Sequence, residues 1–134
     1  MSINIAQCFI AVHDHEQALP FYRDVLGLEV RNDVSYENMR WVTVGPPNQP
    51  DVSIVLEPPL ADPNAPAADR EAMSELLAKG FLRAVNFKTD DVDATFERIQ
   101  AAGGEVLQEP FDQPYGVRDC AFRDPSGNML RFSQ

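Results

Sequence analysis

The feature that most restricts the fold of this chain is a faint internal repeat at an offset of 76 residues. The segment DHEQALPFYRDVLGLEV in the first half aligns with DDVDATFERIQAAGGEV in the second half. The identical positions are Asp14 and Asp90, Ala18 and Ala94, Gly27 and Gly103, Glu29 and Glu105, and Val30 and Val106. A repeat of this kind predicts a domain assembled from two copies of one supersecondary unit.

Each copy carries the signals of a helix with a defined start and stop. Asp14 precedes the first helical segment as an N-cap residue, and Asp90 stands at the same place in the second. Gly27 and Gly103 can adopt the left-handed conformation that ends a helix. Because a proline removes a helical hydrogen bond, we expect Pro20 to kink the first helix or to delay its start.

Runs rich in β-branched and aromatic residues predict one strand before each helix and three strands after it. The later strands are expected at Leu28 to Val34, Met39 to Val44, Val52 to Glu57, Glu105 to Leu107, Val117 to Arg123 and Asn128 to Ser133. Each half is therefore a βαβββ module. The D-P-S-G-N segment at 124–128 predicts a tight hairpin between the last two strands, because proline and glycine suit such a turn.

We expect a single α+β domain over residues 1–134, since a chain of this length can bury one sizeable core. Module one covers 1–57, a linker with a short helix covers 58–80, and module two covers 81–134. The two modules are expected to form a curved, open mixed sheet around a cleft, with the helices outside. A concave sheet of this kind suits small-molecule binding.

Composition excludes several classes of partner. The formal net charge of −10 argues against nucleic acid, because phosphate binding requires clustered Lys and Arg. No apolar run approaches the roughly 20 residues that span a bilayer, so no membrane partner is expected. The N-terminal segment has no basic leader, which favours a cytoplasmic protein. Cys8 and Cys120 lie in strand-like runs, and we expect both thiols to be reduced and buried.

The duplicated modules, the AVHDHEQALPFYRDVLGLEV segment after the first strand and the FRDPSGNMLRF segment near the end together resemble the vicinal-oxygen-chelate superfamily, which contains glyoxalases, bleomycin resistance proteins and dioxygenases. The resemblance covers nearly the whole chain. Its most specific part is the D-P-x-G-N hairpin that follows P-Y-G-V-R at 114–118. By resemblance, the enzymes of this superfamily hold one divalent metal through His or Glu side chains on the first and last strands of each module, and a homodimer is expected.

Most of the positions that correspond to these metal ligands have changed. The resemblance places Gln7, Ala84 and Arg131 at three of them, and only Glu57 at the fourth keeps a ligand-type side chain. An alanine cannot donate to a metal, an arginine is permanently cationic, and a glutamine is a weak neutral ligand. Because catalytic zinc usually has three protein ligands, we expect no metal cofactor, with a divalent metal as the alternative.

The residues of the expected cleft are Gln7, Trp41, Glu57, Tyr115 and Arg131. Arg131 opposite Glu57 would either recognise an anionic group of a ligand or simply pair with Glu57 and close a vacated metal site. Arg83 and Arg118 are further candidates for anion binding. The aromatic residues suit the wall of a small-molecule site, although core or dimer packing is the more frequent role of a strand tryptophan.

Catalytic residues cannot be assigned from the sequence, because no nucleophile and base pair and no phosphate-binding loop is evident. His13 and His15 form an H-x-H pair beside the helix cap, which is a weak metal signal without a third partner. The preferred function is a bleomycin-resistance-like protein that binds a small molecule in its cleft without a metal. The alternatives are a divalent-metal-dependent lyase, isomerase or dioxygenase of the same superfamily, and a protein whose fold serves assembly only.

Overall fold

The computed structural model describes residues 1–134 and has an α+β fold with two βαβββ-like units. The first compact unit is Met1–Ser74 and the second is Glu75–Gln134. The first contains β1 (Gln7–Ala11), α1 (His15–Leu19), the π-helical segment η1 (Pro20–Val25), β2 (Glu29–Tyr36), β3 (Met39–Gly45) and β4 (Ser53–Glu57). The helix α2 (Ala67–Ala78) precedes the elements β5 (Arg83–Lys88), α3 (Val92–Ala101), β6 (Glu105–Asp112), β7 (Arg118–Arg123) and β8 (Met129–Ser133).

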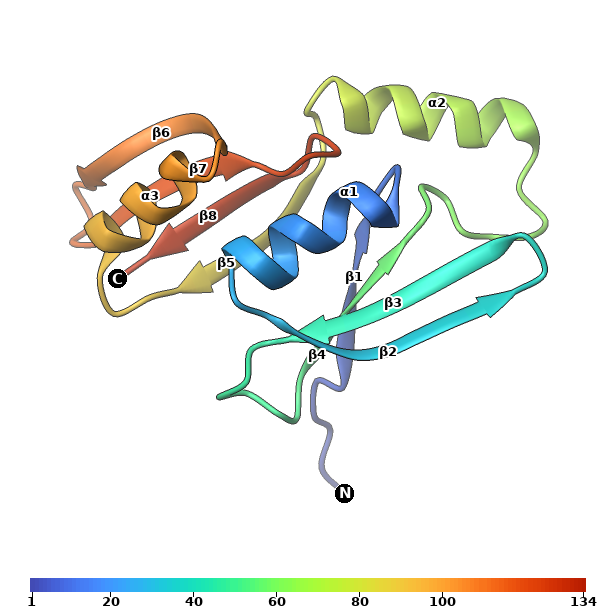
Figure 1. Cartoon of the computed structure of the whole chain (residues 1–134), viewed down its shortest axis with the longest axis horizontal. Coiled ribbons are helices and arrows are strands. Elements are labelled where there is room, and N and C mark those ends of the chain that lie inside the picture. Colours follow the sequence, from blue (N-terminus) through green and yellow to red (C-terminus); the bar gives the residue numbers. More distant parts are fainter. The chain divides into compact units, whose positions relative to one another are not determined.

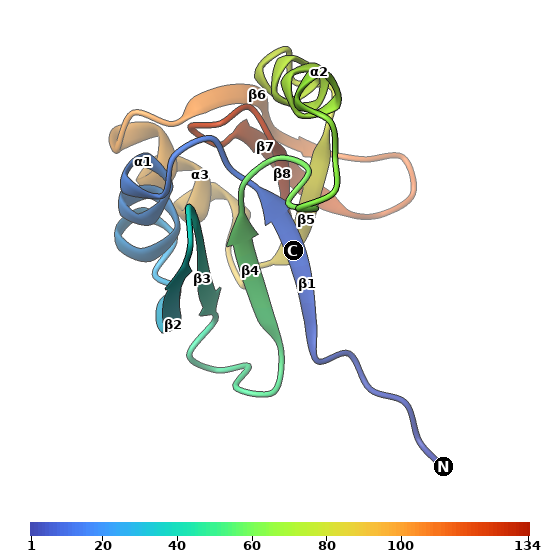
Figure 2. The same ribbon diagram turned by 90° about the vertical axis from the view of Figure 1, so that its right-hand side faces the viewer.

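Both units contain a four-stranded mixed sheet with the same topology. The strand order is β1-β4-β3-β2 in the first and β5-β8-β7-β6 in the second (Figure 1 and Figure 2). In each sheet the first strand pairs in parallel with the last, and the other neighbours are antiparallel. The shared topology confirms the two-module fold that the repeat predicts, and it leaves the first strand of each unit at a sheet edge.

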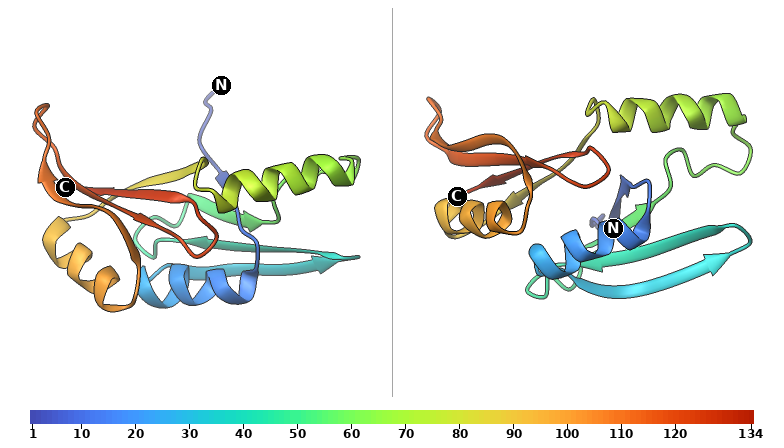
Figure 3. Two further views of the ribbon diagram at one scale, coloured as in Figure 1. Left: turned by 90° about the horizontal axis from the view of Figure 1, so that it is seen from above. Right: turned by 45° about the horizontal axis from the view of Figure 1, so that its top comes forward.

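Each sheet has one face covered by the helix of its own unit. In the first unit the covered face carries Ile10, Val42 and Leu56, which are fully or nearly fully buried. The helical residue Tyr22 is also inaccessible to solvent. In the second unit α3 lies along the sheet (Figure 3), and its Phe96 ring packs in a tilted arrangement against Phe122 of β7 with 5.2 Å between ring centroids. Burial of these side chains is the main source of stability in each unit.

The helix starts differ from the prediction in one respect. Asp14 caps α1 as expected, with its Oδ1 accepting a hydrogen bond of 2.8 Å from the Glu16 amide. In the second unit the cap is Asp91, whose Oδ1 accepts from the Ala94 amide at 3.0 Å, so the prediction of Asp90 is wrong. The end of β5 and the cap Asp91 lie 77 residues after the end of β1 and the cap Asp14, one more than the repeat offset of 76, and the adjacent aspartates at 90 and 91 concealed this shift in the sequence.

The effect of Pro20 is a change of helix type. The helix starts at His15 without delay, α1 ends at Leu19, and the chain continues as the π-helical segment Pro20–Val25. The Leu26 amide reaches back five residues to the Phe21 carbonyl at 3.0 Å. Because proline has no amide hydrogen, widening the helix from this residue onward sacrifices no hydrogen bond from position 20.

Strand β6 is longer than the sequence predicts. It extends from Glu105 to Asp112 instead of ending at Leu107, and it includes Pro110. The strand tolerates this proline because it lies at the edge of the sheet, and its pairing with β7 is irregular on both sides of Gln108. Because prolines normally interrupt strand signals, the residue pattern indicates a strand shorter than the one observed.

The predicted hairpin between the last two strands is confirmed. Asp124 Oδ1 accepts hydrogen bonds of 2.9 Å from the amides of Ser126, Gly127 and Asn128. Gly127 has a φ of 116°, and a β-carbon at this position would collide with the carbonyl oxygen of Leu77 at the end of α2. Only glycine therefore fits this turn.

The expectation for the thiols holds for one cysteine only. Cys120 is fully buried, but Cys8 is exposed, and neither forms a disulfide. Cys8 is the second residue of the edge strand β1, ahead of the part of this strand that becomes buried at Ile10. None of the helices is long and apolar enough to span a membrane.

Candidate functional site

The helix-free face of the first sheet carries three of the predicted site residues. Side chains alternate along a strand, and Phe9 of β1, Val55 of β4 and Thr43 of β3 are in register. Two positions along a strand return to the same face of the sheet. Two positions separate Gln7 from Phe9, Trp41 from Thr43, and Glu57 from Val55. All three therefore project from the face of the sheet opposite Ile10, Val42 and Leu56.

The register separates two of these residues along the strands. Gln7 is opposite Ser53, whereas Glu57 is opposite Ala11 at the other end of the β1–β4 pair. Four residues of strand correspond to about 13 Å. The sheet does not bring Gln7 and Glu57 together, and strand register of this kind cannot be read from the sequence of either strand alone.

Glu57 occupies a partly buried position at the end of β4. Burial raises the pKa of its carboxyl group above the ordinary value, because desolvation disfavours the charged form. No side chain of the first unit forms an ion pair with it. Near it on the same face, Trp41 is half-buried, while Phe9 and Val34 are 57% and 47% exposed. This face is therefore mainly apolar, with one unpaired acid.

The helix-free face of the second sheet contains Arg131, in register with Asn86 of β5 on one side and Ala121 of β7 on the other. A cavity of about 280 Å³ opens here. Its lining consists of Arg83, Ala84, Val85, Asn86, Met129 and Arg131. The second unit thus brings together Ala84 and Arg131, the two residues that the family resemblance places at ligand positions on its first and last strands.

Arg131 forms its ion pair with a residue of its own sheet. Its Nη1 lies 3.2 Å from Asp119 Oδ2 and donates to Gln108 Oε1 at 2.9 Å. Gln108 Nε2 in turn donates to Asp119 Oδ1 at 2.7 Å. Asp119 on the neighbouring strand β7 and Gln108 on β6, the strand beyond it, therefore hold the guanidinium.

Asp119 is the centre of this network. Its side chain is 2% exposed, and its Oδ1, which binds Gln108, also accepts a hydrogen bond of 3.0 Å from Gln113 Nε2. Desolvation alone would raise the pKa of this carboxyl group. The hydrogen bonds from Gln113 and Gln108, together with the charge of Arg131, outweigh desolvation and lower it. Asp119 is consequently a buried anion at neutral pH.

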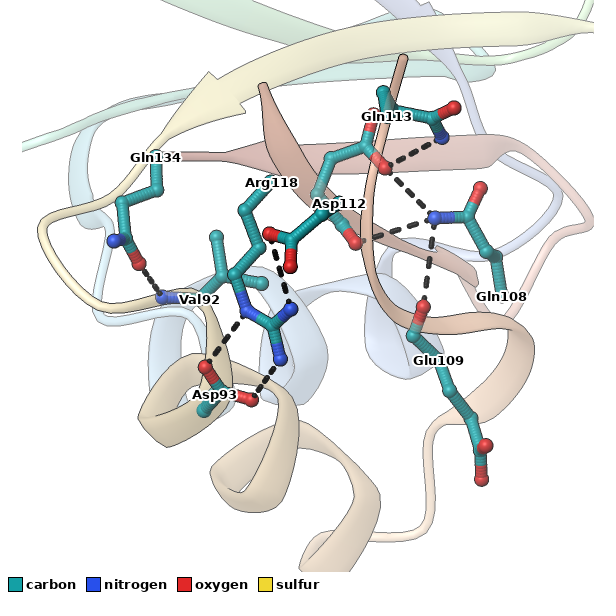
Figure 4. Close-up of polar contacts among 9 residues, drawn as sticks. Val92, Asp93, Gln108, Glu109, Asp112, Gln113, Arg118 and Gln134 are labelled. Atoms are coloured by element: carbon teal, nitrogen blue, oxygen red, sulfur yellow. Dashed lines mark hydrogen bonds and ion pairs between the residues drawn. The ribbon is translucent and has the colours of Figure 1, made fainter. Parts of the chain in front are cut away.

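The other predicted residues are placed as follows. Tyr115 is 72% exposed in the loop between β6 and β7. Arg118 is already engaged, because its guanidinium forms a forked contact with Asp93 at 2.8 and 3.0 Å and an ion pair with Asp112 (Figure 4). His15 is buried, with its Nε2 hydrogen-bonded to the Leu56 carbonyl at 2.8 Å. Its role there is structural.

The donor set does not fit the metal that the family resemblance implies. The resemblance places an amide, an alanine and an arginine at three of the positions, and the strand register makes Val55, two positions before Glu57, the counterpart of Arg131 in the first unit. No group of three or more His, Cys, Asp or Glu side chains is arranged to hold a metal ion. We therefore derive no metal-dependent step for this chain.

Sequence reasoning missed Asp119, Gln108 and Gln113. One signal was present, because Asp119 interrupts the otherwise apolar character of a buried strand. A buried aspartate almost always has a partner, so this position should have directed attention to a nearby cation. The two glutamines carried no comparable signal, since amides are common on exposed strands.

Comparisons with known proteins agree with this fold. The family model described as Glyoxalase/Bleomycin resistance protein/Dioxygenase superfamily matches residues 4–132. The chain is 30% identical over 126 residues to the Bacillus subtilis (strain 168) protein YurT, covering 93% of this chain and 94% of YurT. The crystal structure of UcmS2 superposes with a TM-score of 0.89 at 34% identity, covering 99% and 98% of the two chains.

A second solved structure has a stated binding role. TnmS3, described as an antibiotic binding protein from Streptomyces sp. CB03234, matches with a TM-score of 0.76 at 32% identity, over 100% of this chain and 98% of TnmS3. The family match extends over almost the entire sequence and both βαβββ units. The chain belongs to the Glyoxalase/Bleomycin resistance protein/Dioxygenase superfamily.

Proposed function

We propose that this chain is a metal-free binding protein for a small organic molecule, and that the cavity of the second unit receives part of the ligand. The observation that carries the proposal is the cavity of about 280 Å³, which has Arg131 and Ala84 in its lining where the family's enzymes have metal ligands. Its size is close to the lower end of known ligand pockets, which begin at about 300 Å³.

Two further observations support a binding role. The lining combines apolar contacts from Val85 and Met129 with polar groups from Arg83, Asn86 and Arg131, a mixture typical of sites for organic ligands. TnmS3, which is similar over the full length, is described as an antibiotic binding protein. By analogy, a drug-sized organic ligand is the class to test first.

Contact of the ligand with Gln7, Trp41, Glu57 and Tyr115 stays a prediction, as does the homodimer that the family resemblance implies. Light scattering of the purified protein in solution tests the homodimer. A change in Trp41 emission on ligand binding tests the contribution of the first unit.

The decisive experiment measures metal content and ligand-dependent stability. Protein purified without chelator is analysed for metals, and thermal unfolding is followed with Ni²⁺, Zn²⁺, Mn²⁺ or Fe²⁺ and with a panel of drug-sized aromatic compounds. A ligand at 100 times its Kd stabilises the native state by about 2.7 kcal/mol. We expect stabilisation by compounds of the panel and none by the metals.

A matched pair of variants assigns the binding to the cavity. Ala84→Phe fills the space beside Arg131, whereas Ala101→Phe adds the same ring at an exposed position of α3. We expect the first variant to abolish the stabilisation by ligand and the second to retain it. Near-stoichiometric metal, or equal ligand stabilisation in both variants, would contradict the proposal.

A further inference from the structure

The guanidinium of Arg131 has one side engaged with protein and one side free. A guanidinium has five N–H donors, two on each terminal nitrogen and one on Nε. Nη1 contacts both Asp119 and Gln108, whereas Nε and Nη2 have no protein partner. These two nitrogens form the edge of the guanidinium that binds a carboxylate in a forked contact. The donors that the protein leaves unused are therefore the ones best suited to a planar anion.

The engaged side fixes the orientation of this free edge. Asp119 is almost fully buried and is itself held by amide groups of Gln108 and Gln113. An arginine supported in this way loses little conformational freedom when a ligand binds. Asp119 contacts Arg131 only through Nη1, and its other contacts are with the two glutamines, so it leaves the Nε and Nη2 edge of Arg131 unoccupied.

The charge of the cavity favours an anion. Two arginines, Arg83 and Arg131, contribute to the lining, and no carboxylate does. Arg83 forms no ion pair, and Asn86 adds an exposed amide in register with Arg131. Asp119 offsets only part of this positive charge. In a chain with a formal net charge of −10, an excess of cationic groups in one cavity indicates a specific role.

We propose that the cavity recognises a planar anionic group of the ligand, a carboxylate or an equivalent acidic group, through the Nε and Nη2 edge of Arg131. This inference rests on the proposed small-molecule-binding function and names the chemical class of the group bound. Asp119, Gln108 and Gln113 act as positioning residues for Arg131, and Arg83 supplies a second positive charge. Val85 and Met129 contact the apolar body that carries the acid.

The test compares three probes of the same shape and different charge. Benzoate, benzamide and benzamidine are titrated into ¹⁵N-labelled protein at constant ionic strength, and the Arg131 Nε–H signal and the amides of Ala84 and Asn86 are followed by NMR. We expect benzoate to shift all three signals in a saturable manner, benzamide to shift them weakly, and benzamidine to leave them unchanged. Equal shifts with benzamide, or no shifts with benzoate, would overturn the proposal.

Variants of Arg131 and its surroundings distinguish binding through a forked guanidinium contact from attraction by a positive charge alone. Arg131→Lys keeps the positive charge beside Asp119 and removes the fork, and we expect benzoate to bind about tenfold more weakly. Gln108→Ala leaves the charge of Arg131 unchanged and removes one contact that positions its guanidinium. We expect a few-fold loss of affinity for benzoate, which would show that this contact orients Arg131 for binding. Arg98→Gln, at an exposed position of α3, is the control for net charge and should bind as the wild type does.

Failure of this inference is distinguishable from failure of the proposed function. If Ala84→Phe abolishes binding of benzoate and benzamide alike, and both bind the wild type equally, the cavity binds small molecules without recognising charge. If benzoate binds but Arg131→Lys has no effect on its Kd, the assignment to the guanidinium fork is wrong. If Ala84→Phe changes the binding of neither the aromatic probes nor the drug-sized compounds, the cavity assignment fails as well.

Discussion

The two helix-free sheet faces share one scaffold and carry opposite chemistry. Val55 and Arg131 occupy equivalent positions, because each lies on the last strand and pairs with the residue five positions before its helix cap. By the same equivalence, Phe9 corresponds to Asn86, and Trp41 corresponds to Asp119. The first face is therefore mainly apolar, and the second has a connected network of charged and amide groups.

The helix-covered faces do not differ in this way. Leu56 and Val42 of the first unit correspond to Phe132 and Cys120 of the second, and all four are buried and apolar. A covered face must fill the space beneath its helix, so its composition is restricted by packing. The helix-free face carries no such requirement, and the two units can diverge there in polarity while their topology stays the same.

The largest expected effect comes from breaking the network. Asp119→Ala leaves the partly buried Arg131 without its anion, and we expect the free energy of unfolding to fall by about 3 kcal/mol. Trp41→Ala at the equivalent position of the first unit should cost about 1.5 kcal/mol, because the indole is only half-buried and leaves no charge unpaired. Denaturant unfolding measures both values, and equal losses would contradict the contrast between the two faces.

Thiol reactivity should also differ between the units. Burial raises the pKa of the Cys120 thiol to about 11, whereas Cys8 is exposed. Because the thiolate fraction falls tenfold for each pKa unit, we expect Cys8 to react with a thiol reagent at least about a hundredfold faster. Cys8→Ser should abolish the fast phase. Two equally fast thiols in the native protein would show that Cys120 is accessible.

The two carboxylates should give opposite dependences of stability on pH. Asp119 has a lowered native pKa, so its contribution to stability is present above its unfolded pKa of about 3.9 and is lost as pH falls through the native value. Glu57 has a raised native pKa, so its ionisation destabilises the native state as pH rises from about 4.3 through that value.

Replacing each carboxylate by the matching amide tests both predicted pH dependences. The stability difference between wild type and Asp119→Asn should shrink on acidification below about pH 4, because the unfolded chain binds a proton at this aspartate before the native protein does. Glu57→Gln should be more stable than the wild type at neutral pH and lose that advantage in acid. Thermal unfolding of the three proteins across this pH range gives the comparison. On acidification, the stability relative to wild type should rise for Asp119→Asn and fall for Glu57→Gln. A change in the same direction for both variants would refute the assigned electrostatics.

The smallest expected effect is optical. If the ligand contacts the first unit, the emission of Trp41, the only tryptophan, should change in intensity or wavelength on binding. Trp41→Phe keeps an aromatic ring and removes the signal, which provides the control. Some compounds should bind the wild type but not Ala84→Phe. If such a compound leaves the Trp41 emission unchanged, the ligand contacts the second unit only.

Much of the fold could be predicted because local signals repeat. The strand and helix order, the terminal hairpin and the stops at Gly27 and Gly103, both with positive φ, follow from residue types and spacing. The errors arose where a local signal had two interpretations. Adjacent aspartates at 90 and 91 concealed the true cap, and Pro110 concealed the length of an edge strand that tolerates proline.

The sequence by itself determined the family resemblance and the duplicated modules, and it predicts the replacement of most metal-ligand positions, because these depend on residue identity and order. Only the tertiary structure decided that Arg131 pairs with Asp119 and lines a cavity with Ala84, and that Gln7 and Glu57 lie at opposite ends of their strand pair. The physical reason is strand register. A contact between strands depends on which residues face each other across the sheet, and neither strand encodes this alone.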